Sequence, residues 1–166
     1  MSEDPAFVLR DIAVRDDRAI AAVIRDVMTE HGCTGQGFAI HDAEVDAMSA
    51  AYASEGARYV VVEHGGTVVG GGGFARLHGS RVEDATCELR KMYFRPEARG
   101  RGLGAALLDR LLKAMRELGY RRCYLETTTQ MRAAQKLYRR AGFAERCGAL
   151  GNTGHHGCDR FFTREL

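Results

Sequence analysis

ELRKMYFRPEARGRGLGAALLDRLL, residues 88–112, contains three signals from which the fold of this chain can be predicted. An alternating apolar segment is typical of a β-strand, a loop of arginines and glycines follows it, and an apolar-periodic segment then predicts a helix. The loop therefore lies at the N-terminus of a helix, where backbone N–H groups are unpaired and the helix dipole is positive. This position predicts an anion site, for which a phosphate or pyrophosphate is the natural ligand.

The glycines of the loop alternate with arginines. Glycine has no Cβ, so a bulky anion can approach the backbone closely, and arginine adds positive charge. A nucleotide-triphosphate loop is excluded because Gly104 is followed by alanines instead of Lys-Ser/Thr. A dinucleotide fingerprint is the main rival, since GRGLGA fits G-x-G-x-x-A and Glu126 follows at a suitable distance. Residues 95–99 separate the loop from the strand, and too little chain follows for such a domain, so we disfavour that rival.

The segments before this stretch alternate between strand and helix signals. We expect a strand at 7–12, a helix at 16–31 capped by Asp16 or Asp17, and a second helix from Asp42 to about residue 52. Residues 57–77 predict a hairpin that turns at Gly65-Gly66. The run Gly70–Gly73 indicates a bulge or the close approach of another backbone, or a splayed edge strand without function.

The segments after the loop continue the alternation. We expect a helix at 102–118 ended by Gly119, a strand at 121–129, and a short helix closed by Gly142. Strands at 143–147 and 159–166 flank a glycine-rich loop. The whole order predicts mixed helix and strand packed as one domain, residues 1–166.

The composition excludes several classes of protein. The net charge of +2 comes from 24 basic and 22 acidic residues without a basic stripe, so we expect no nucleic-acid partner. No window approaches the roughly 18–20 apolar residues of a membrane span, and the N-terminal MSEDPAF lacks an apolar signal core. The expected location is cytoplasmic, with no membrane partner. Five cysteines without a C-x-x-C pair are expected to be reduced.

Residues 88–108, followed by YLET (124–127) and AQKLYRRAGF (134–143), resemble the GNAT superfamily of acyl-CoA-dependent N-acyltransferases. The loop pattern of that superfamily, Arg/Gln-x-x-Gly-x-Gly/Ala, is matched by Arg99, Gly102 and Gly104. The resemblance implies a single-domain α/β (α+β) fold. Its twisted sheet would be mixed but mostly antiparallel, with a splayed central strand pair and helices on both faces.

The resemblance also implies an activity. The chain would transfer an acetyl group from acetyl-CoA directly to a primary amine, of a small molecule in preference to a protein, without a covalent enzyme intermediate and without a metal. A non-catalytic coenzyme A sensor and a protein or peptide amine acetyltransferase stay open as alternatives. The acceptor is not encoded in a recognisable motif, and a homodimer is one expected assembly. The implied cofactor-binding residues are Met92, Tyr93, Phe94, Arg99, Gly100, Arg101, Gly102, Leu103, Gly104 and Ala105.

Three residues are implied to be catalytic. Glu88 would be the general base, and strand alternation is expected to place its side chain on the same face as that of Met92. The Met92 N–H would bind the thioester oxygen, and Tyr138 would meet the coenzyme sulfur. Each also has a purely structural interpretation: an exposed Glu88, and core packing by Met92, Phe94 and Tyr138. A Glu near pKa ~4.3 facing an ammonium near ~10.4 is a poor base unless burial raises its pKa.

One position departs from the superfamily pattern. Met131 stands where relatives commonly carry an Asn that binds the pantetheine arm. Cys87 and Cys123 lie on predicted strands and are expected to be core thiols. His31, Cys33, His155, His156 and Cys158 have side chains that could ligate zinc, but their spacing matches no known zinc motif. We expect the loop that carries the last three to line the substrate side or to be a solvated turn.

Overall fold

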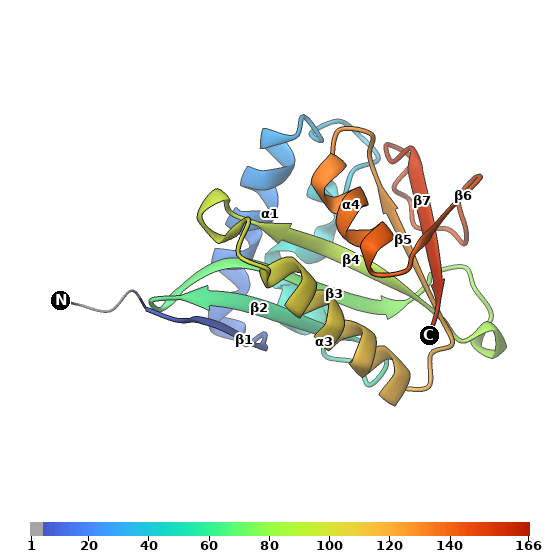
Figure 1. The fold of residues 1–166 in the computed structure, drawn as a ribbon, viewed down its shortest axis with the longest axis horizontal. Helices are drawn as coiled ribbons and strands as arrows, with labels where there is room; N and C mark the ends of the chain where they lie inside the picture. The colour runs from blue at the N-terminus through green and yellow to red at the C-terminus, as the bar shows by residue number, and fades with distance from the viewer. Residues whose placement is uncertain (1–4) are drawn as a thin grey trace.

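One sheet organises the computed structural model, which describes residues 5–166 (Figure 1). Residues 1–4, part of the acidic N-terminal segment, lie outside the described residues. The strand order is β1-β2-β3-β4-β5-β7-β6. The β4–β5 pair is parallel and the other neighbours are antiparallel, which confirms the expected mixed, mostly antiparallel sheet. The strands are β1 (Phe7–Asp11), β2 (Arg58–His64), β3 (Thr67–Arg76), β4 (Thr86–Phe94), β5 (Arg122–Thr127), β6 (Ala144–Arg146) and β7 (Arg160–Glu165).

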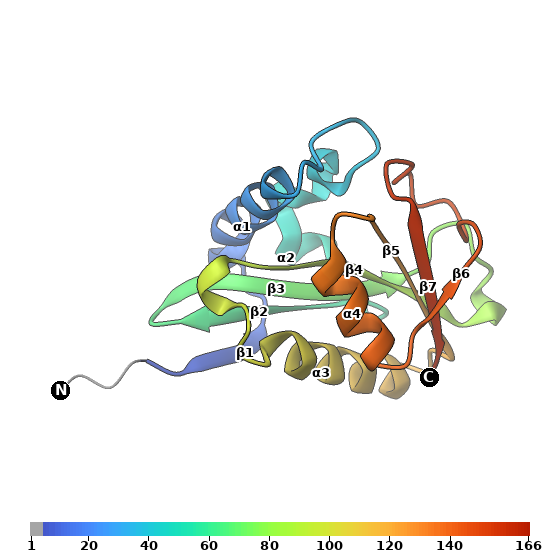
Figure 2. The same ribbon diagram turned by 45° about the horizontal axis from the view of Figure 1, so that its top comes forward.

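Helices cover both faces of the sheet, as predicted (Figure 2). On one face α1 (Asp17–Glu30) and the single-turn α2 (Met48–Ala51) bury an apolar cluster against β2. On the other face α3 (Leu103–Glu117) and α4 (Arg132–Arg140) bury a second cluster. Short 3-10 turns connect these elements: η1 (Val14–Asp16), η2 (Ala39–His41), η3 (Ala43–Ala47), η4 (Val82–Asp84) and η5 (Pro96–Ala98). None of the helices within residues 5–166 has the length and apolar character needed to cross a bilayer.

The run Gly70–Gly73 lies in β3, an interior strand, so the edge-strand interpretation is wrong. A Cβ on Gly73 would lie 2.4 Å from the carbonyl oxygen of Arg58 on the neighbouring strand. A Cβ on Gly71 would lie 3.1 Å from Ile20 of α1, and one on Gly72 would lie 3.3 Å from Leu107 of α3. The glycines therefore allow a neighbouring backbone, as predicted, and also helices on both faces to approach β3.

The expected helix caps differ from the observed contacts. The Asp16 carboxylate accepts hydrogen bonds from the Ala13 N–H and from Arg10, and the Asp17 carboxylate accepts from Ser49. Neither caps α1 through its side chain. The helix expected from Asp42 is instead the 3-10 turn η3 followed by α2. The Asp42 side chain makes no capping hydrogen bond; its carboxylate instead contacts Lys91 and His155, which belong to the site described below.

The expected splay occurs between β4 and β5. These strands pair only from Thr86 to Glu88 and diverge beyond that point. A bulge follows on β4, where Lys91 has a φ of 48° and Gly71 and Gly73 pair with Tyr93 and Arg90. The extra residue reverses the side-chain alternation. Met92 packs with the α3 cluster, whereas Glu88 faces the α1 side, so the prediction that both share one face is wrong.

Candidate functional site

Three cavities meet along the splayed edge of β4. The first, of about 440 Å³, lies between the end of β4, the loop of residues 99–104 (the Arg-Gly loop) and α4. A small inner cavity of about 40 Å³ shares Tyr93 and Met131 with the first. An outer cavity of about 460 Å³ shares Glu88, Lys91 and His155 with the inner one. The inner cavity therefore lies between the two larger cavities and shares lining residues with each.

The Arg-Gly loop has the backbone geometry of an anion cradle. Gly100 and Gly102 adopt φ of 70° and 76°, and a Cβ on either would meet no atom within 4 Å. Gly102 is the N-cap of α3. Within the described part of the chain, the N–H groups of residues 100–105 find no hydrogen-bond acceptor. These donors at a helix N-terminus fit a pyrophosphate, because they supply unpaired N–H groups in open space.

The two arginines of the loop have structural partners. The Arg99 guanidinium donates to both carboxylate oxygens of Glu30 at 2.7 Å and to the Phe94 carbonyl at 2.8 Å. The Arg101 Nε donates to the Glu97 carbonyl at 2.9 Å, and its guanidinium lies 5.2 Å from the centre of the Phe7 ring. Both arginine side chains stabilise the loop through these contacts, so the backbone amides are its unpaired donors.

Most of the predicted cofactor-binding residues line the first cavity. They are Met92, Tyr93, Phe94, Arg99, Gly100, Gly102, Leu103 and Gly104, whereas Arg101 and Ala105 do not form its wall. Sequence analysis missed the contribution of α1 and of the first turn of α4, including His31 and Arg132. Met131, at the position of the family Asn, lies where the first and inner cavities meet, and its sulfur accepts a hydrogen bond from Thr127 at 3.6 Å.

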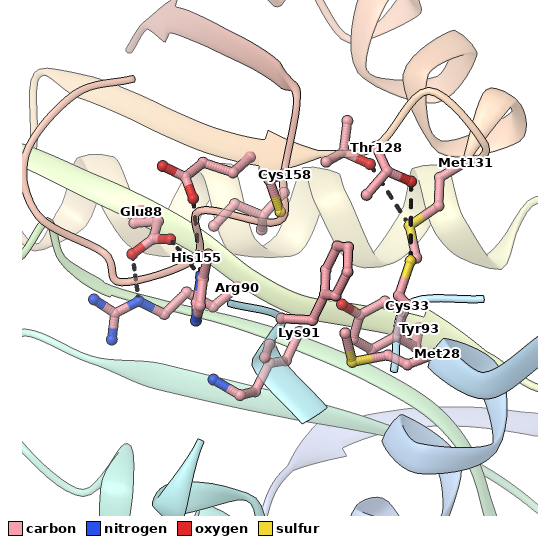
Figure 3. A pocket seen from close by; sticks show the side chains of 15 residues that line it. Met28, Cys33, Glu88, Arg90, Lys91, Tyr93, Thr128, Met131, His155 and Cys158 are labelled. Carbon is pink, nitrogen blue, oxygen red and sulfur yellow. Dashed lines mark hydrogen bonds and ion pairs between the residues drawn. The ribbon is translucent and has the colours of Figure 1, made fainter. Parts of the chain in front are cut away.

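Glu88 is buried at the junction of the inner and outer cavities (Figure 3). Its side chain is 3% exposed, which contradicts the interpretation of Glu88 as an exposed structural residue. One carboxylate oxygen accepts from the Arg90 Nε at 2.7 Å. Burial raises the pKa of Glu88, and the Arg90 charge only partly offsets that effect. A pKa raised by burial is what a glutamate needs in order to act as a general base, and Glu88 meets that requirement.

His155 faces Glu88 from the C-terminal loop (Figure 3). Its Nδ1 lies 4.0 Å from a Glu88 oxygen and 3.9 Å from a Glu126 oxygen. The Glu126 carboxylate accepts hydrogen bonds from the Tyr124 hydroxyl at 2.6 Å and from Thr153 at 2.8 Å. The glycine-rich loop is thus bound to the end of β5 and lines the inner and outer cavities, so the interpretation of this loop as a solvated turn does not describe His155. That the loop lies on the substrate side stays a prediction.

The opposite ring nitrogen of His155 is held by Asp42. Nε2 lies 2.9 Å from an Asp42 oxygen, and the same carboxylate accepts from the buried Lys91 ammonium at 2.7 Å. Lys91 also hydrogen-bonds Glu44. Burial alone would lower the pKa of His155, but the Asp42 hydrogen bond and charge raise it. Burial would raise the pKa of Asp42, but His155 and Lys91 lower it.

Tyr138 lines the first cavity and also packs in the core, so both sequence interpretations of this residue describe its surroundings. Its ring lies 5.9 Å from that of Phe143 and 6.3 Å from that of Phe162. Burial raises the pKa of the Tyr138 phenol above its ordinary value of 10. The hydroxyl therefore stays protonated at neutral pH and can donate a hydrogen bond.

The thiols of the inner cavity are poorly suited to nucleophilic catalysis. Burial raises the pKa of Cys158 to about 12 and raises that of Cys33 as well. Because the thiolate is the reactive form of cysteine, both are largely inert at neutral pH. Cys87 and Cys123 are buried in the core, as predicted.

No sequence pattern pointed to the positions of Asp42, Lys91 and Glu126 at these cavities. Asp42 was predicted only as a helix cap, and Lys91 gave no signal because the bulge that turns it inward is not visible in the sequence. Glu126 could have been found, since Glu88 pairs with Tyr124 across the parallel strands. Residue 126 therefore shares the face of Glu88.

Comparison with known proteins identifies relatives of this chain. The profile of the Acetyltransferase (GNAT) family matches residues 24–143. An uncharacterized N-acetyltransferase of Escherichia coli strain K12, YjgM, is 45% identical over 160 residues, which cover 96% of this chain and 95% of that protein.

Solved structures of acetyltransferases share the fold. An acetyltransferase of the GNAT family from Staphylococcus aureus Mu50 superposes with a TM-score of 0.79 at 20% identity, covering 97% of this chain and 99% of its own. The phosphinothricin acetyltransferase of Sinorhizobium meliloti, in complex with acetyl-CoA, superposes with a TM-score of 0.75 at 27% identity, covering 96% of this chain and 88% of its own.

Proposed function

This chain belongs to the GNAT family of acetyltransferases, and from that premise we propose that it transfers the acetyl group of acetyl-CoA to a primary amine of a small molecule. The observation that carries the proposal is the junction of the cavities. A cavity with an anion cradle adjoins a small inner cavity, and a buried glutamate with a raised pKa lines that inner cavity.

The first cavity offers groups for the pyrophosphate, the pantetheine arm and the thioester of acetyl-CoA. The N–H groups of residues 100–105 would bind the pyrophosphate, and the backbone of Met92–Phe94 would bind the pantetheine arm along the splayed edge. Acetyl-CoA would supply the activated acetyl group as a thioester. The Met92 N–H would donate to the thioester oxygen, where negative charge develops during acyl transfer.

Glu88 is the proposed proton acceptor. An ordinary Glu and a primary ammonium differ by about 6 pKa units, which corresponds to roughly 8 kcal/mol. Burial raises the pKa of Glu88 and so narrows this difference. Tyr138 would donate a hydrogen bond to the departing sulfur; because burial raises its pKa, full proton transfer from the phenol is unfavourable.

The size of the inner cavity supports a small-molecule acceptor. Its volume is about 40 Å³, and two loops close it through Cys33 and Phe38 on one side and His155 and Cys158 on the other. Such a space admits little more than an amine and an acetyl group. The outer cavity beyond it is lined mainly by polar and charged side chains, which favours a polar acceptor.

The experiment is an assay of coenzyme A release with acetyl-CoA and a panel of amines: the amino acids, polyamines, amine-bearing antibiotics and a lysine-containing peptide. We expect turnover with at least one small amine and none with the peptide. Turnover with the peptide alone would favour a protein acetyltransferase. Saturable binding of acetyl-CoA without turnover on any amine would favour a coenzyme A sensor, and either result contradicts the proposal.

A further inference from the structure

We propose that Glu88, Glu126 and His155 form a three-point seat for the primary ammonium group of the acceptor, in which Glu126 and His155 determine specificity. The inference deepens the proposed function and rests on it. Glu88 lies on β4 where the pairing with β5 stops, Glu126 lies near the end of β5, and His155 lies in the C-terminal loop. The three side chains meet beside the junction of the inner and outer cavities.

The spacing of the three side chains leaves room for a small cation between them. The Nδ1 of His155 lies 3.9 and 4.0 Å from the two carboxylate oxygens, and the three acceptor atoms all lie within 4.8 Å of one another. Acceptors placed tetrahedrally about 2.8 Å from a nitrogen lie about 4.6 Å apart. Ligands about 2.0–2.1 Å from zinc lie about 3.3 Å apart, so the two His155 distances would lengthen by about 0.6 Å around an ammonium ion and shorten by a similar amount around zinc.

The charge of the site also calls for a cation. Among the described residues around the junction, four carboxylates (Asp42, Glu44, Glu88 and Glu126) face two permanent cations, Arg90 and Lys91. Lys91 pairs with Asp42 and Glu44, and Arg90 pairs with Glu88. The Glu126 side chain is 4% exposed, and its hydrogen bonds come from hydroxyl groups. A buried carboxylate in this position is stabilised by a cationic ligand.

Asp42 fixes the orientation of His155. When the neutral imidazole donates its Nε2–H to Asp42, the Nδ1 lone pair faces the seat as a third acceptor. Lys91 holds the Asp42 carboxylate in place from the β4 bulge. Asp42 and Lys91 are therefore positioning residues, whereas His155 itself touches the acceptor.

Three acceptors match the three N–H groups of a primary ammonium ion. A secondary ammonium ion leaves one acceptor unpaired, and a quaternary ion leaves all three unpaired. The seat therefore predicts discrimination by the number of N–H groups as well as by charge. The remainder of the acceptor would extend into the outer cavity, beside Arg90 and Asn152.

Nitrogen-15 NMR of the histidine-labelled full-length chain at pH 8 tests the seat without turnover. The His155 resonance is assigned by its loss in His155→Gln. Methylammonium chloride is titrated against it, and tetramethylammonium chloride at equal ionic strength is the matched ligand. We expect methylammonium to shift the Nδ1 resonance with a dissociation constant at least about 10-fold lower than that of tetramethylammonium. Glu126→Gln should weaken methylammonium binding by at least about 10-fold, and the exposed Glu117→Gln should leave it unchanged.

Equal responses to the two ammonium salts would overturn the seat, and this comparison in the unaltered protein needs no variant to fold. Unchanged methylammonium affinity in Glu126→Gln would also overturn it. Zinc chloride added alone must not saturate the His155 resonance at one equivalent, because that result would make the cluster a metal site. The titrations contain no acetyl-CoA, so failure of the seat is distinguishable from failure of acetyl transfer.

Discussion

Glu88 and His155 are the residues on which the proposed chemistry depends most. Glu88 is buried, His155 is half-buried, and both line the inner and outer cavities. Arg90 of the same strand holds Glu88, whereas Asp42, which is 113 positions away, holds His155. The pKa of Glu88 therefore depends in part on its own strand, and that of His155 depends on a distant part of the sequence.

Replacement of Glu88 by Gln tests its role as base. We expect kcat/KM for the best amine to fall by about 100-fold or more, while the Kd for acetyl-CoA stays the same. In the unaltered protein kcat/KM should rise with pH as Glu88 loses its proton. That rise should lie above the usual range of a glutamate, because burial raises the pKa. An unchanged pH profile in Glu88→Gln would remove Glu88 from this role.

His155 should make stability depend on pH. Asp42 and Glu88 raise the pKa of His155 against the opposing effects of burial and Lys91. Glu126 also faces its ring. Because the folded pKa lies above the unfolded value near 6.5, the stabilisation is complete below about pH 6.5 and is lost as pH rises through the folded pKa. Urea unfolding should thus show a larger loss of stability for His155→Gln at pH 5.5 than at pH 8.5. An equal loss at both pH values would contradict the raised pKa.

At the scale of elements, the candidate site forms where strand β4 diverges from β5. The pairing with β5 ends at Glu88, and the bulge at Lys91 turns the rest of β4 towards the Arg-Gly loop. The same bulge moves Lys91 inward to hold Asp42. One irregular strand thus shapes the first, inner and outer cavities.

The glycine strand β3 permits this arrangement, and Gly73→Ala tests it. The new Cβ would lie 2.4 Å from the Arg58 carbonyl oxygen, so the backbone must shift. We expect urea unfolding to show a loss of about 3 kcal/mol. Gly66→Ala is the matched control, because its site is open but its φ is 82°. The control should lose only about 1–2 kcal/mol. Equal losses would show that crowding at β3 is unimportant.

Many of the helices and strands, and part of their arrangement, could be predicted from the sequence. The hairpin turning at Gly65-Gly66, the helix α3 and the splay follow from local patterns and from the resemblance to a family. The face of Met92 was predicted wrongly because a bulge changes alternation without changing composition. The contact of Asp42 with Lys91 and His155 joins residues 49 and 113 positions apart, which no local pattern encodes.

At the scale of the whole molecule, one sheet separates two apolar clusters and supports the site at its splayed edge. Two adjacent residues of β2, Val60 and Val61, belong to opposite clusters. Loss of one cluster would therefore expose the other. This coupling supports the proposal that residues 1–166 form one domain.

A single cooperative unfolding transition is the expected consequence. The chain has six tyrosines and no tryptophan, so tyrosine fluorescence reports tertiary packing while far-UV circular dichroism reports secondary structure. The two signals should give the same urea midpoint. Two separated midpoints would show that the clusters unfold independently and would contradict a single domain.

Calorimetric titration of acetyl-CoA into the purified chain, and into Gly102→Val, tests the central claim most directly. We expect one site per chain with a Kd between about 1 μM and 1 mM in the unaltered protein. Affinity should fall at least about 10-fold in the variant, because a branched side chain would fill the open space above the loop amides. Absence of binding at millimolar acetyl-CoA, or equal affinity in the two proteins, would contradict the account.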